Sequence, residues 1–412
     1  MVPLYLPMTL DEVSAAGNTP TFFGGINVFL SHKVPFHRKA PGWWRKLFDH
    51  PRLLKWASGK AAKTRAADVG ELNVSMLRGE EGNQVRELDE LIRWLKTQPK
   101  PDAIFLSNAL LAGFARKMKA ELGTRVIVFL QSEESFLDSM PEPWRTKSWD
   151  VLAERAEEVD GWISPSRYFA ERMSERLGLR SERVEVVHNG INLTGYPAGP
   201  KPTRSPSLPL VLGYFARMCP EKGLDVVVDA FIRLREGGDF PSLKLKIGGS
   251  CGPGDEPYVM EQVAKLTAAD LLADVSLHKN VSRTEKIEFY GSCDILSVPS
   301  RQSEAFGLSI IESLAAGTPL VLPTTATFPE LLGITGGGVL CGPNTPLALA
   351  KTLAQVLPDP ARLAAMGEAG RNVVRSRFTD EVMAGEIVLA SQRLIDRDGN
   401  GNRPRVTSSK NR

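Results

Sequence analysis

The chain has 412 residues, a formal net charge of +3, 42% hydrophobic residues and 24% charged residues. This composition is typical of globular proteins and excludes a disordered or collagen-like chain, and the length predicts two or three domains. No apolar run approaches the roughly 18 residues of a membrane span and the first residues lack a basic region, so we expect a cytoplasmic protein.

Positive charge is concentrated near the beginning of the chain. Between His32 and Arg65 there are ten Lys or Arg and one acidic residue, a net charge of +9, whereas the remaining 41 basic and 47 acidic residues give −6. Within the basic segment 33–63, four aromatic residues of the stretch 40–63 interleave with the cations: Trp43, Trp44, Phe48 and Trp56. Such a segment suits peripheral contact with anionic lipid at the inner membrane surface, and equally an ordinary helix docked on a sheet. Without a recognition module, nucleic acid binding is not expected.

Short apolar runs rich in β-formers alternate with helical stretches from residue 101 onward. The runs DAIFLSN, RVIVFLQ, GWISPS and VEVVHNGIN are each separated by a stretch of helical periodicity. This alternation is typical of βαβ units on a parallel sheet. We therefore expect a Rossmann-like N-terminal domain over residues 1–197.

The same pattern restarts after a proline-rich break. Residues 197–209, PAGPKPTRSPSLP, contain five prolines and are expected to link two domains. Six further apolar runs then alternate with helices and predict a second Rossmann-like domain over residues 208–375. A C-terminal helix at about 379–395 is expected to pack back on the first domain, and residues 396–412 to be disordered. The predicted fold class is α/β, with two doubly wound domains facing a cleft.

The stretch RQSEAFGLSIIESLAAGTP, residues 301–319, carries two carboxylates eight positions apart. The preceding run CDILSVPS predicts a buried strand, and a helix is expected from near Gly307 to Gly317, so Glu304 lies on the strand-to-helix loop and Glu312 on the helix. Ligands of open α/β sheets bind at this edge, and the N–H groups at a helix start favour phosphate.

These two carboxylates suit different parts of a phosphorylated ligand. The amides of Phe306, Gly307 and Leu308 would take the phosphate, which Glu304 would repel, so Glu304 is better suited to the hydroxyls of a sugar and Glu312 to those of a ribose. In the alternative interpretation, Glu312 is an exposed helix residue and Glu304 only complements the helix dipole.

Two cations follow an earlier strand in GYFARMCPEKGLD, residues 213–225. The strand is expected to end near Ala216, and Arg217 and Lys222 then lie in the loop before a helix that opens around Gly223. Two cations at this edge can neutralise a diphosphate, although ordinary surface solvation is the alternative.

Other motifs are missing from the sequence. The five histidines form no H-E-x-x-H pattern and the four cysteines no C-x-x-C pair, so we expect no metal site. The chain also lacks G-x-G-x-x-G and G-x-x-x-x-G-K-[ST], which disfavours a dinucleotide oxidoreductase and a P-loop NTPase.

Together these patterns resemble the family-4 retaining glycosyltransferases of the GT-B fold. The resemblance rests on the E-x7-E spacing of Glu304 and Glu312, the F-x-R-x-x-x-x-K-G run ending at Lys222, the pair Gly24-Gly25 and the run VVHNGIN. It implies that Arg217 and Lys222 hold the diphosphate of a nucleotide-sugar, with Glu304 on the donor sugar and Glu312 on the ribose. It also implies backbone contacts from Phe306, Gly307 and Leu308, and a tight phosphate loop at Gly24 and Gly25.

Two positions depart from the family pattern on the acceptor side. Where the family often has a histidine at a strand end, this chain has Gln131, and N-G-V-D is replaced by Asn189-Gly190-Ile191-Asn192. The nearby His188 could act as a base, but we interpret it as a strand-end residue.

The sequence thus predicts a hexosyltransferase of glycan biosynthesis. It would move a sugar from a nucleotide-diphosphate donor, UDP- or GDP-linked, to an acceptor hydroxyl with retention, and need no metal or other cofactor. The acceptor could be a glycan, a lipid-linked molecule or a small molecule. Two alternatives stay open: a nucleotide-sugar-binding protein without transferase activity, and a GT-B nucleotide-sugar epimerase.

Overall fold

The computed structural model describes residues 66–401 apart from 203, 204 and 206, and within them the chain forms two compact units. In the described part, unit 1 comprises residues 66–164, 170–186 and 388–401, and unit 2 comprises residues 165–169 and 187–387. The second unit thus takes in 187–197 and the short segment 165–169, which the proline-rich break alone did not indicate.

Unit 2 is built on a six-stranded parallel sheet with the order β7-β6-β5-β8-β9-β10. Its strands are β5 (Val211–Phe215), β6 (Lys244–Gly249), β7 (Val275–Lys279), β8 (Ile295–Ser297), β9 (Leu320–Pro323) and β10 (Gly338–Cys341). The first three strands are added in one direction and the last three in the other, so the order reverses between β5 and β8. This reversal is the defining feature of a doubly wound Rossmann-like sheet, and ligands bind where it occurs.

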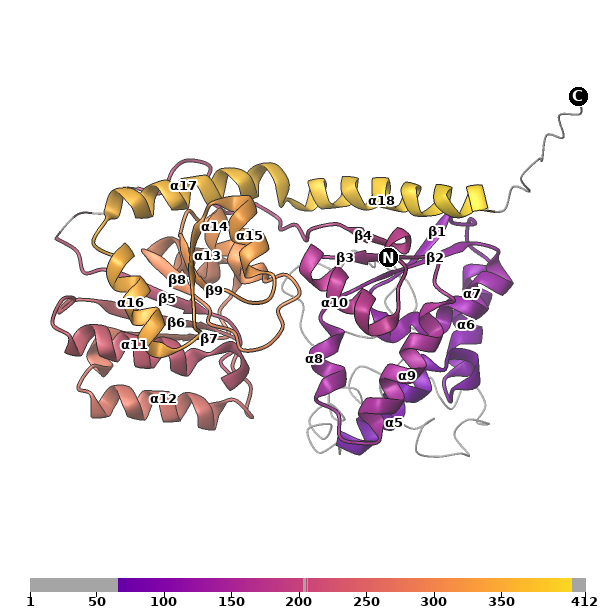
Figure 1. Cartoon of the computed structure of the whole chain (residues 1–412), viewed down its shortest axis with the longest axis horizontal. Coiled ribbons are helices and arrows are strands. Elements are labelled where there is room, and N and C mark those ends of the chain that lie inside the picture. The colour runs from indigo at the N-terminus through magenta and orange to yellow at the C-terminus, as the bar shows by residue number, and fades with distance from the viewer. Residues whose placement is uncertain (1–65, 203–204, 206, 402–412) are drawn as a thin grey trace, which may run out of the picture. The chain divides into compact units, whose positions relative to one another are not determined.

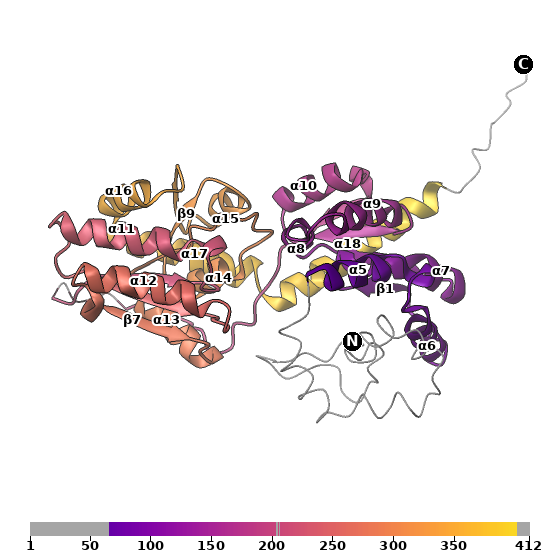
Figure 2. The ribbon, with the colours of Figure 1, turned by 90° about the horizontal axis from the view of Figure 1, so that it is seen from below.

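Helices cover both faces of this sheet (Figure 1). One face carries α11 (Leu224–Glu236), α12 (Glu256–Ala268) and α16 (Pro346–Val356), of which α11 and α16 lie side by side (Figure 2). The other carries α13 (Arg283–Ser292), α14 (Leu308–Ala315), α15 (Phe328–Thr335) and α17 (Pro360–Arg377). The short turns η4 (Pro220–Lys222) and η5 (Leu272–Asp274) complete the unit.

The central strands β5, β8 and β9 are buried almost throughout, which explains their continuous apolar runs, whereas the edge strands β7 and β10 are partly exposed. Along β5, Leu212 and Tyr214 belong to the apolar cluster under α11, whereas Phe215 belongs to the cluster under α13 and α14. Side chains alternate between the two faces of a strand, so each face needs its own apolar set.

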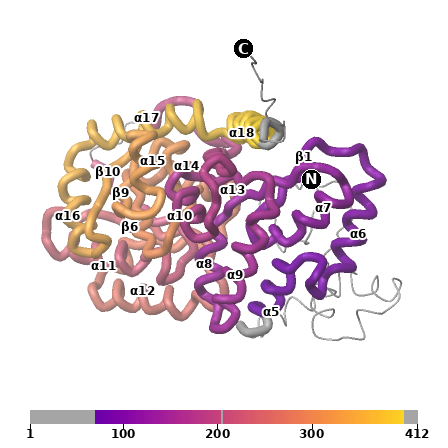
Figure 3. Tube along the Cα trace, turned by 45° about the vertical axis from the view of Figure 1, so that its right-hand side comes forward, coloured from indigo at the N-terminus to yellow at the C-terminus, as the bar shows by residue number. Residues whose placement is uncertain are grey.

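The described residues of unit 1 form a parallel sheet of four strands in the sequential order β1-β2-β3-β4. Its strands are β1 (Ala103–Leu106), β2 (Arg125–Phe129), β3 (Gly161–Ser164) and β4 (Val184–Val186). Its helices are α5 (Ala66–Leu77), α6 (Val85–Leu95), α7 (Ala115–Leu122), α8 (Glu133–Asp138), α9 (Trp144–Ala156) and most of α10 (Arg167–Leu177), with the turns η1 (Gly79–Glu81), η2 (Ala109–Phe114) and η3 (Ser181–Arg183). Helix α5 packs beside α9 (Figure 3). Among the described strands, those of unit 1 follow one another in sequence order, whereas those of unit 2 reverse their order.

The C-terminal helix α18 (Asp380–Gly401) ends in unit 1. Leu394 packs so closely on β3 that a Cβ atom added to Gly161 would lie 2.6 Å from its Cδ1 atom. Arg393 and Arg397 each form an ion pair with Glu185 of β4. The helix runs to Gly401, beyond residue 396, at which the disordered tail was expected to begin. No helix of the described chain has the length and apolar character to cross a membrane.

Candidate functional site

The two charged motifs predicted from the sequence meet at the switch point of unit 2. Lys222 follows β5, Glu304 follows β8, and these strands are neighbours at the point where the strand order reverses. The Lys222 ammonium donates a short hydrogen bond to Glu304 Oε2 and forms an ion pair with it. Both side chains are about four-fifths buried, with 24% and 19% of their surface exposed. Doubly wound sheets bind their ligands at this edge, so the ion pair lies at the expected ligand site.

The two loops that carry this pair touch through their backbones. Gly223, with φ of +73°, is the cap residue directly before α11, and a Cβ atom there would lie 2.2 Å from the carbonyl oxygen of Pro299. Only glycine fits this close approach and this left-handed conformation. In addition, the Arg301 N–H donates to the Glu221 carbonyl at 2.8 Å. The Lys-Gly pair of the sequence motif therefore joins the loop after β5 to the loop after β8.

Arg217 lies on the same edge of the sheet but has a different partner. Its Nη2 lies 2.9 Å from Asp255 Oδ1 and its Nε lies 3.2 Å from Oδ2, and 62% of its side chain is exposed. The hydrogen bond from Arg217 lowers the pKa of Asp255, which also accepts from the Gly252 N–H at 3.0 Å. The guanidinium is thus anchored in a fixed direction while keeping exposed N–H groups. Asp255 was not predicted, because it lies on another loop with no spacing relation to Arg217.

Glu312 is held inside unit 2 by two side chains of α13. Its Oε2 accepts a hydrogen bond from the Tyr290 hydroxyl at 2.9 Å, and its Oε1 lies 2.7 Å from Lys286 Nζ. With 13% of the side chain exposed, Glu312 is not the exposed helix residue of the alternative interpretation. Burial and the charge of Glu312 raise the pKa of the Tyr196 hydroxyl, which is buried and has no hydrogen-bond partner among the described residues. Tyr196 is therefore a polar group near Glu312 that sequence reasoning missed.

The helix start beside Glu304 is built as predicted. Gly307, with φ of +90°, precedes α14, and Leu308 is its first residue, with a half-exposed side chain. The N–H groups of a first helical turn have no acceptor within the helix and carry its positive end, which suits an anion. The Phe306 side chain is buried against the rings of His188 and Phe378, at centroid distances of 6.1 Å from each, so only its backbone is available to a ligand.

His188 is bound to a carboxylate on α15. Its Nε2 lies 3.1 Å from Glu330 Oε1, and Glu330 also accepts hydrogen bonds from the N–H groups of Arg167 and Tyr168 at 2.9 and 3.0 Å. Burial opposes the charge of Glu330, but the bonds from His188 and these two N–H groups lower its pKa. These contacts agree with the interpretation of His188 as a strand-end residue held by its surroundings.

The acceptor-side candidate lies in unit 1. Gln131 is exposed just after β2, and its N–H donates to Glu133 Oε2 at 2.7 Å, while Oε1 of Glu133 accepts from the Ala109 N–H at 2.8 Å. Glu133 is almost completely buried, and burial raises its pKa. Gly24 and Gly25, as well as the basic aromatic segment 33–63, lie outside the described residues.

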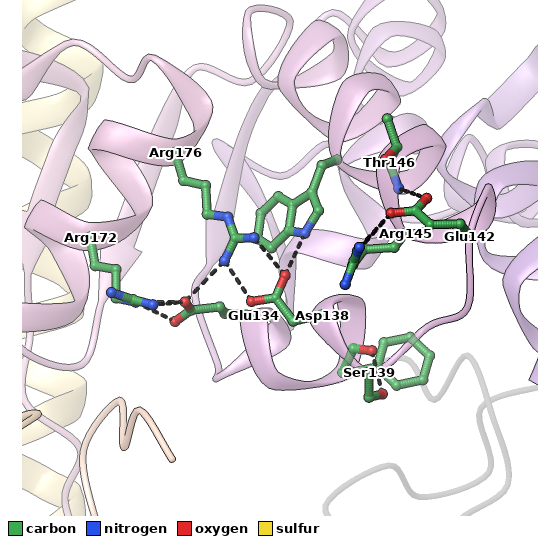
Figure 4. A network of polar contacts seen from close by, with 10 residues as sticks. Glu134, Asp138, Ser139, Glu142, Arg145, Thr146, Arg172 and Arg176 are labelled. Carbon is green, nitrogen blue, oxygen red and sulfur yellow. Dashed lines mark hydrogen bonds and ion pairs between the residues drawn. The ribbon is translucent and has the colours of Figure 1, made fainter. Parts of the chain in front are cut away.

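A charged network fixes the short helix α8 that follows Gln131. Glu134 accepts hydrogen bonds from Arg172 and Arg176, and Asp138 accepts from Arg176 and from the Trp149 indole at 2.9 Å (Figure 4). The Arg176 guanidinium also lies 3.9 Å from the centre of the Trp149 ring. The network connects α8 to α9 and α10, so the loop between β2 and α8 leads into a helix that is held in place. Within residues 66–401, no group of three or more His, Cys, Asp or Glu side chains could hold a metal ion.

Two parallel-sheet α/β units in one chain, with the charged groups at the switch point of the second, define the GT-B fold. Residues 58–194 match the family described as Glycosyltransferase Family 4, and residues 199–373 match Glycosyl transferases group 1. The two matched regions follow one another along the chain and together span most of it. The fold class predicted from the sequence is thereby confirmed.

Curated relatives with similar sequences include sugar-transferring enzymes. The D-inositol 3-phosphate glycosyltransferase of Segniliparus rotundus is 29% identical over 59% of this chain and 54% of its own length, and that of Thermobifida fusca is 31% identical over 56% and 54%. A glycogen synthase of Mycobacterium tuberculosis is 28% identical over 57% and 55%. The chain thus spans about half the length of these relatives.

Solved structures with the same fold cover more of the chain. The sucrose-phosphate synthase of Thermosynechococcus elongatus has a TM-score of 0.62 at 20% identity and covers 76% of this chain and 79% of its own. Anabaena HepE in complex with UDP and glucose has a TM-score of 0.61 at 19% identity and covers 74% and 81%. At these identities the likeness shows the fold alone.

Proposed function

We propose that this chain is a retaining glycosyltransferase that takes a hexose from a nucleotide-diphosphate donor. The observation that carries the proposal is the Lys222–Glu304 pair at the switch point of unit 2, next to the start of α14. A cation and a helix start suit a diphosphate, while a carboxylate beside them suits sugar hydroxyls. HepE is described in complex with UDP and with UDP-glucose, which favours UDP as the nucleotide.

In the proposed donor complex, each residue has a separate role. Lys222 has three N–H donors and gives one to Glu304, so two remain for the phosphates. Arg217, anchored by Asp255, adds a second cation, and Glu312 accepts from the ribose hydroxyls. Glu304 accepts from hydroxyls of the sugar and thereby orients its anomeric carbon.

The proposed chemistry needs no nucleophile from the protein. The C1–O bond to the diphosphate breaks as positive charge develops on the sugar, and Lys222, Arg217 and the α14 start stabilise the departing phosphate oxygen. The acceptor hydroxyl attacks from the same face, and its proton passes to that phosphate oxygen, so the configuration at C1 is retained. No metal takes part in this scheme.

A nucleotide panel tests the proposal. Calorimetry with UDP, GDP, ADP and their hexose conjugates should show binding of one nucleoside diphosphate and its sugar, and incubation with acceptors should release the nucleoside diphosphate. NMR of the product should show the same anomeric configuration as the donor. Conversion of the donor sugar without an acceptor would support the epimerase, and binding without any conversion would support the binding protein.

The acceptor remains a proposal based on the basic aromatic segment 33–63. The net charge of +9 over residues 32–65, against −6 elsewhere, would orient this segment toward an anionic surface, and each Lys or Arg near such a membrane contributes about 1 kcal/mol. We expect weak binding to phosphatidylserine vesicles at low salt, lost at a few tenths molar salt and after combined replacement of Trp43, Trp44, Arg45 and Lys46 by alanine.

Sedimentation with vesicles measures this binding, with phosphatidylcholine vesicles as the control. Equal sedimentation with both lipids would contradict membrane contact and favour a soluble glycan or small-molecule acceptor. Preference for the anionic vesicles would favour a lipid-linked acceptor.

A further inference from the structure

The residues on both sides of Glu304 are hydrogen-bonded to one short segment of the chain. The Ser166 hydroxyl donates to the Ala305 carbonyl at 2.6 Å, and the hydroxyls of Tyr168 and Ser303 lie 3.0 Å apart. Segment 165–169 and the loop after β8 both belong to unit 2, although more than 130 positions separate them in the sequence. The backbone of Glu304 is therefore held before and after the residue, while its side chain is held by Lys222.

Segment 165–169 is itself fixed by three further hydrogen bonds. The Ser166 oxygen accepts from the Phe169 N–H at 3.1 Å, so this serine caps the start of α10. The next two N–H groups, of Arg167 and Tyr168, both donate to the Glu330 carboxylate. These are the N–H groups that a helix start leaves without acceptors, and a carboxylate is favoured there. The segment is thus a rigid support, because its own polar groups are satisfied.

Burial makes the contact between Ser166 and Ala305 specific. Ser166 is fully buried and Ala305 is 2% exposed, so water cannot replace the hydroxyl at the carbonyl. If the Ala305 carbonyl lost this donor, it would stay buried without a hydrogen bond, which is unfavourable. A movement of the loop that exposes the carbonyl to water would then lower the free energy. Loss of this hydrogen bond should therefore displace the loop after β8.

We propose that Ser166 and Tyr168 are positioning residues for Glu304, holding its loop so that the carboxylate meets the donor sugar. The assignment of Glu304 to the sugar rests on the proposed function, whereas the bracing of the loop rests on the contacts alone. Ser166 acts through the Ala305 carbonyl and Tyr168 through the Ser303 hydroxyl. Neither residue needs to touch the donor.

Hydrogen exchange in the free protein tests the bracing without any ligand. In Ser166→Ala and in Tyr168→Phe, peptides that cover residues 303–308 should exchange faster than in the wild type, on the order of two- to ten-fold. The half-buried Tyr168 loses only one oxygen in this substitution, so that variant should fold even if Ser166→Ala does not. The matched control is Ser297→Ala, whose buried hydroxyl donates to the Val321 carbonyl at 2.8 Å within the sheet.

Binding of UDP and UDP-glucose then tests the link to Glu304. Ser166→Ala should weaken UDP-glucose binding several-fold and leave UDP binding unchanged, because UDP has no sugar for Glu304 to contact. In a Glu304→Gln background, Ser166→Ala should have no further effect on UDP-glucose, since residues that act through one another are not additive. A purely structural defect would weaken both ligands and would persist in that background.

The outcomes separate the two proposals. Unchanged exchange of residues 303–308 in both variants would overturn the bracing, whatever the protein binds. Faster exchange with equal losses of UDP and UDP-glucose would overturn the role in sugar positioning. If the wild type binds neither ligand, the proposed UDP donor fails, and the exchange result still decides whether segment 165–169 holds the loop.

Discussion

Replacing Glu304 by glutamine should reduce sugar transfer at least a hundred-fold, on the order of the 10²–10³ lost with one preorganised polar group at a reacting centre. Affinity for UDP should stay nearly unchanged, because Glu304 is assigned to the sugar and not to the phosphates. The substitution preserves the size of the side chain, so the hydrogen bonds of Ser303 to Tyr168 and of Ala305 to Ser166 should remain. Initial rates at saturating donor and acceptor measure the first effect, and calorimetry with UDP measures the second.

A matched control separates this effect from general loss of charge. Glu121→Gln also removes a carboxylate from a lysine pair, because Glu121 lies 2.7 Å from Lys96 in unit 1. This variant should transfer sugar at the wild-type rate. Turnover of Glu304→Gln close to the wild type, with an unchanged melting temperature, would exclude the assigned role.

The edge of the sheet that carries the site could be predicted from the sequence. Lys222 and Glu304 each follow an apolar run and precede a helix, and such loops always lie at the carboxyl ends of parallel strands. What the pattern could not provide is the strand order. Only the adjacency of β5 and β8 brings two residues 82 positions apart into one ion pair.

The partners of the predicted residues were missed for a similar reason. Asp255 anchors Arg217 from a loop before α12, and Lys286 and Tyr290 hold Glu312 from α13. These contacts join different helices, so no spacing within the sequence indicates them. Arg217 and Lys222, predicted to hold a diphosphate, each also have a carboxylate partner in this structure.

Segment 165–169 shows how tertiary contacts assign a function to residues that look ordinary in sequence. The run GWISPSRYF indicates a strand followed by a helix, and Ser166 is a normal helix cap there. Its second hydrogen bond, to Ala305, depends on the path of a loop that starts more than a hundred residues later. Ser166 thus accepts a hydrogen bond from the first turn of α10 and at the same time donates one to the loop that carries Glu304.

Replacing Lys222 by alanine should weaken UDP binding about ten- to a hundred-fold, because a charge-assisted hydrogen bond contributes roughly 1.5 to 3 kcal/mol. The loss has two sources, since the variant also leaves the Glu304 carboxylate without its cation beside the phosphates. The double variant Lys222→Ala/Glu304→Gln should therefore bind UDP more tightly than Lys222→Ala alone, yet remain unable to transfer sugar. Arg217→Ala should cost less, since its side chain is 62% exposed and solvent screens its charge.

The control for this series is a lysine at the opposite edge of the same sheet. Lys244 begins β6 and lies 2.7 Å from Asp274 Oδ1, so Lys244→Ala removes an equal charge from a comparable ion pair. Its affinity for UDP should match the wild type, as measured by calorimetry at one salt concentration. Equal losses for Lys244→Ala and Lys222→Ala would mean that UDP responds only to the overall charge of unit 2. A loss confined to Lys222, with partial recovery in the double variant, would place the phosphates beside the Lys222–Glu304 pair.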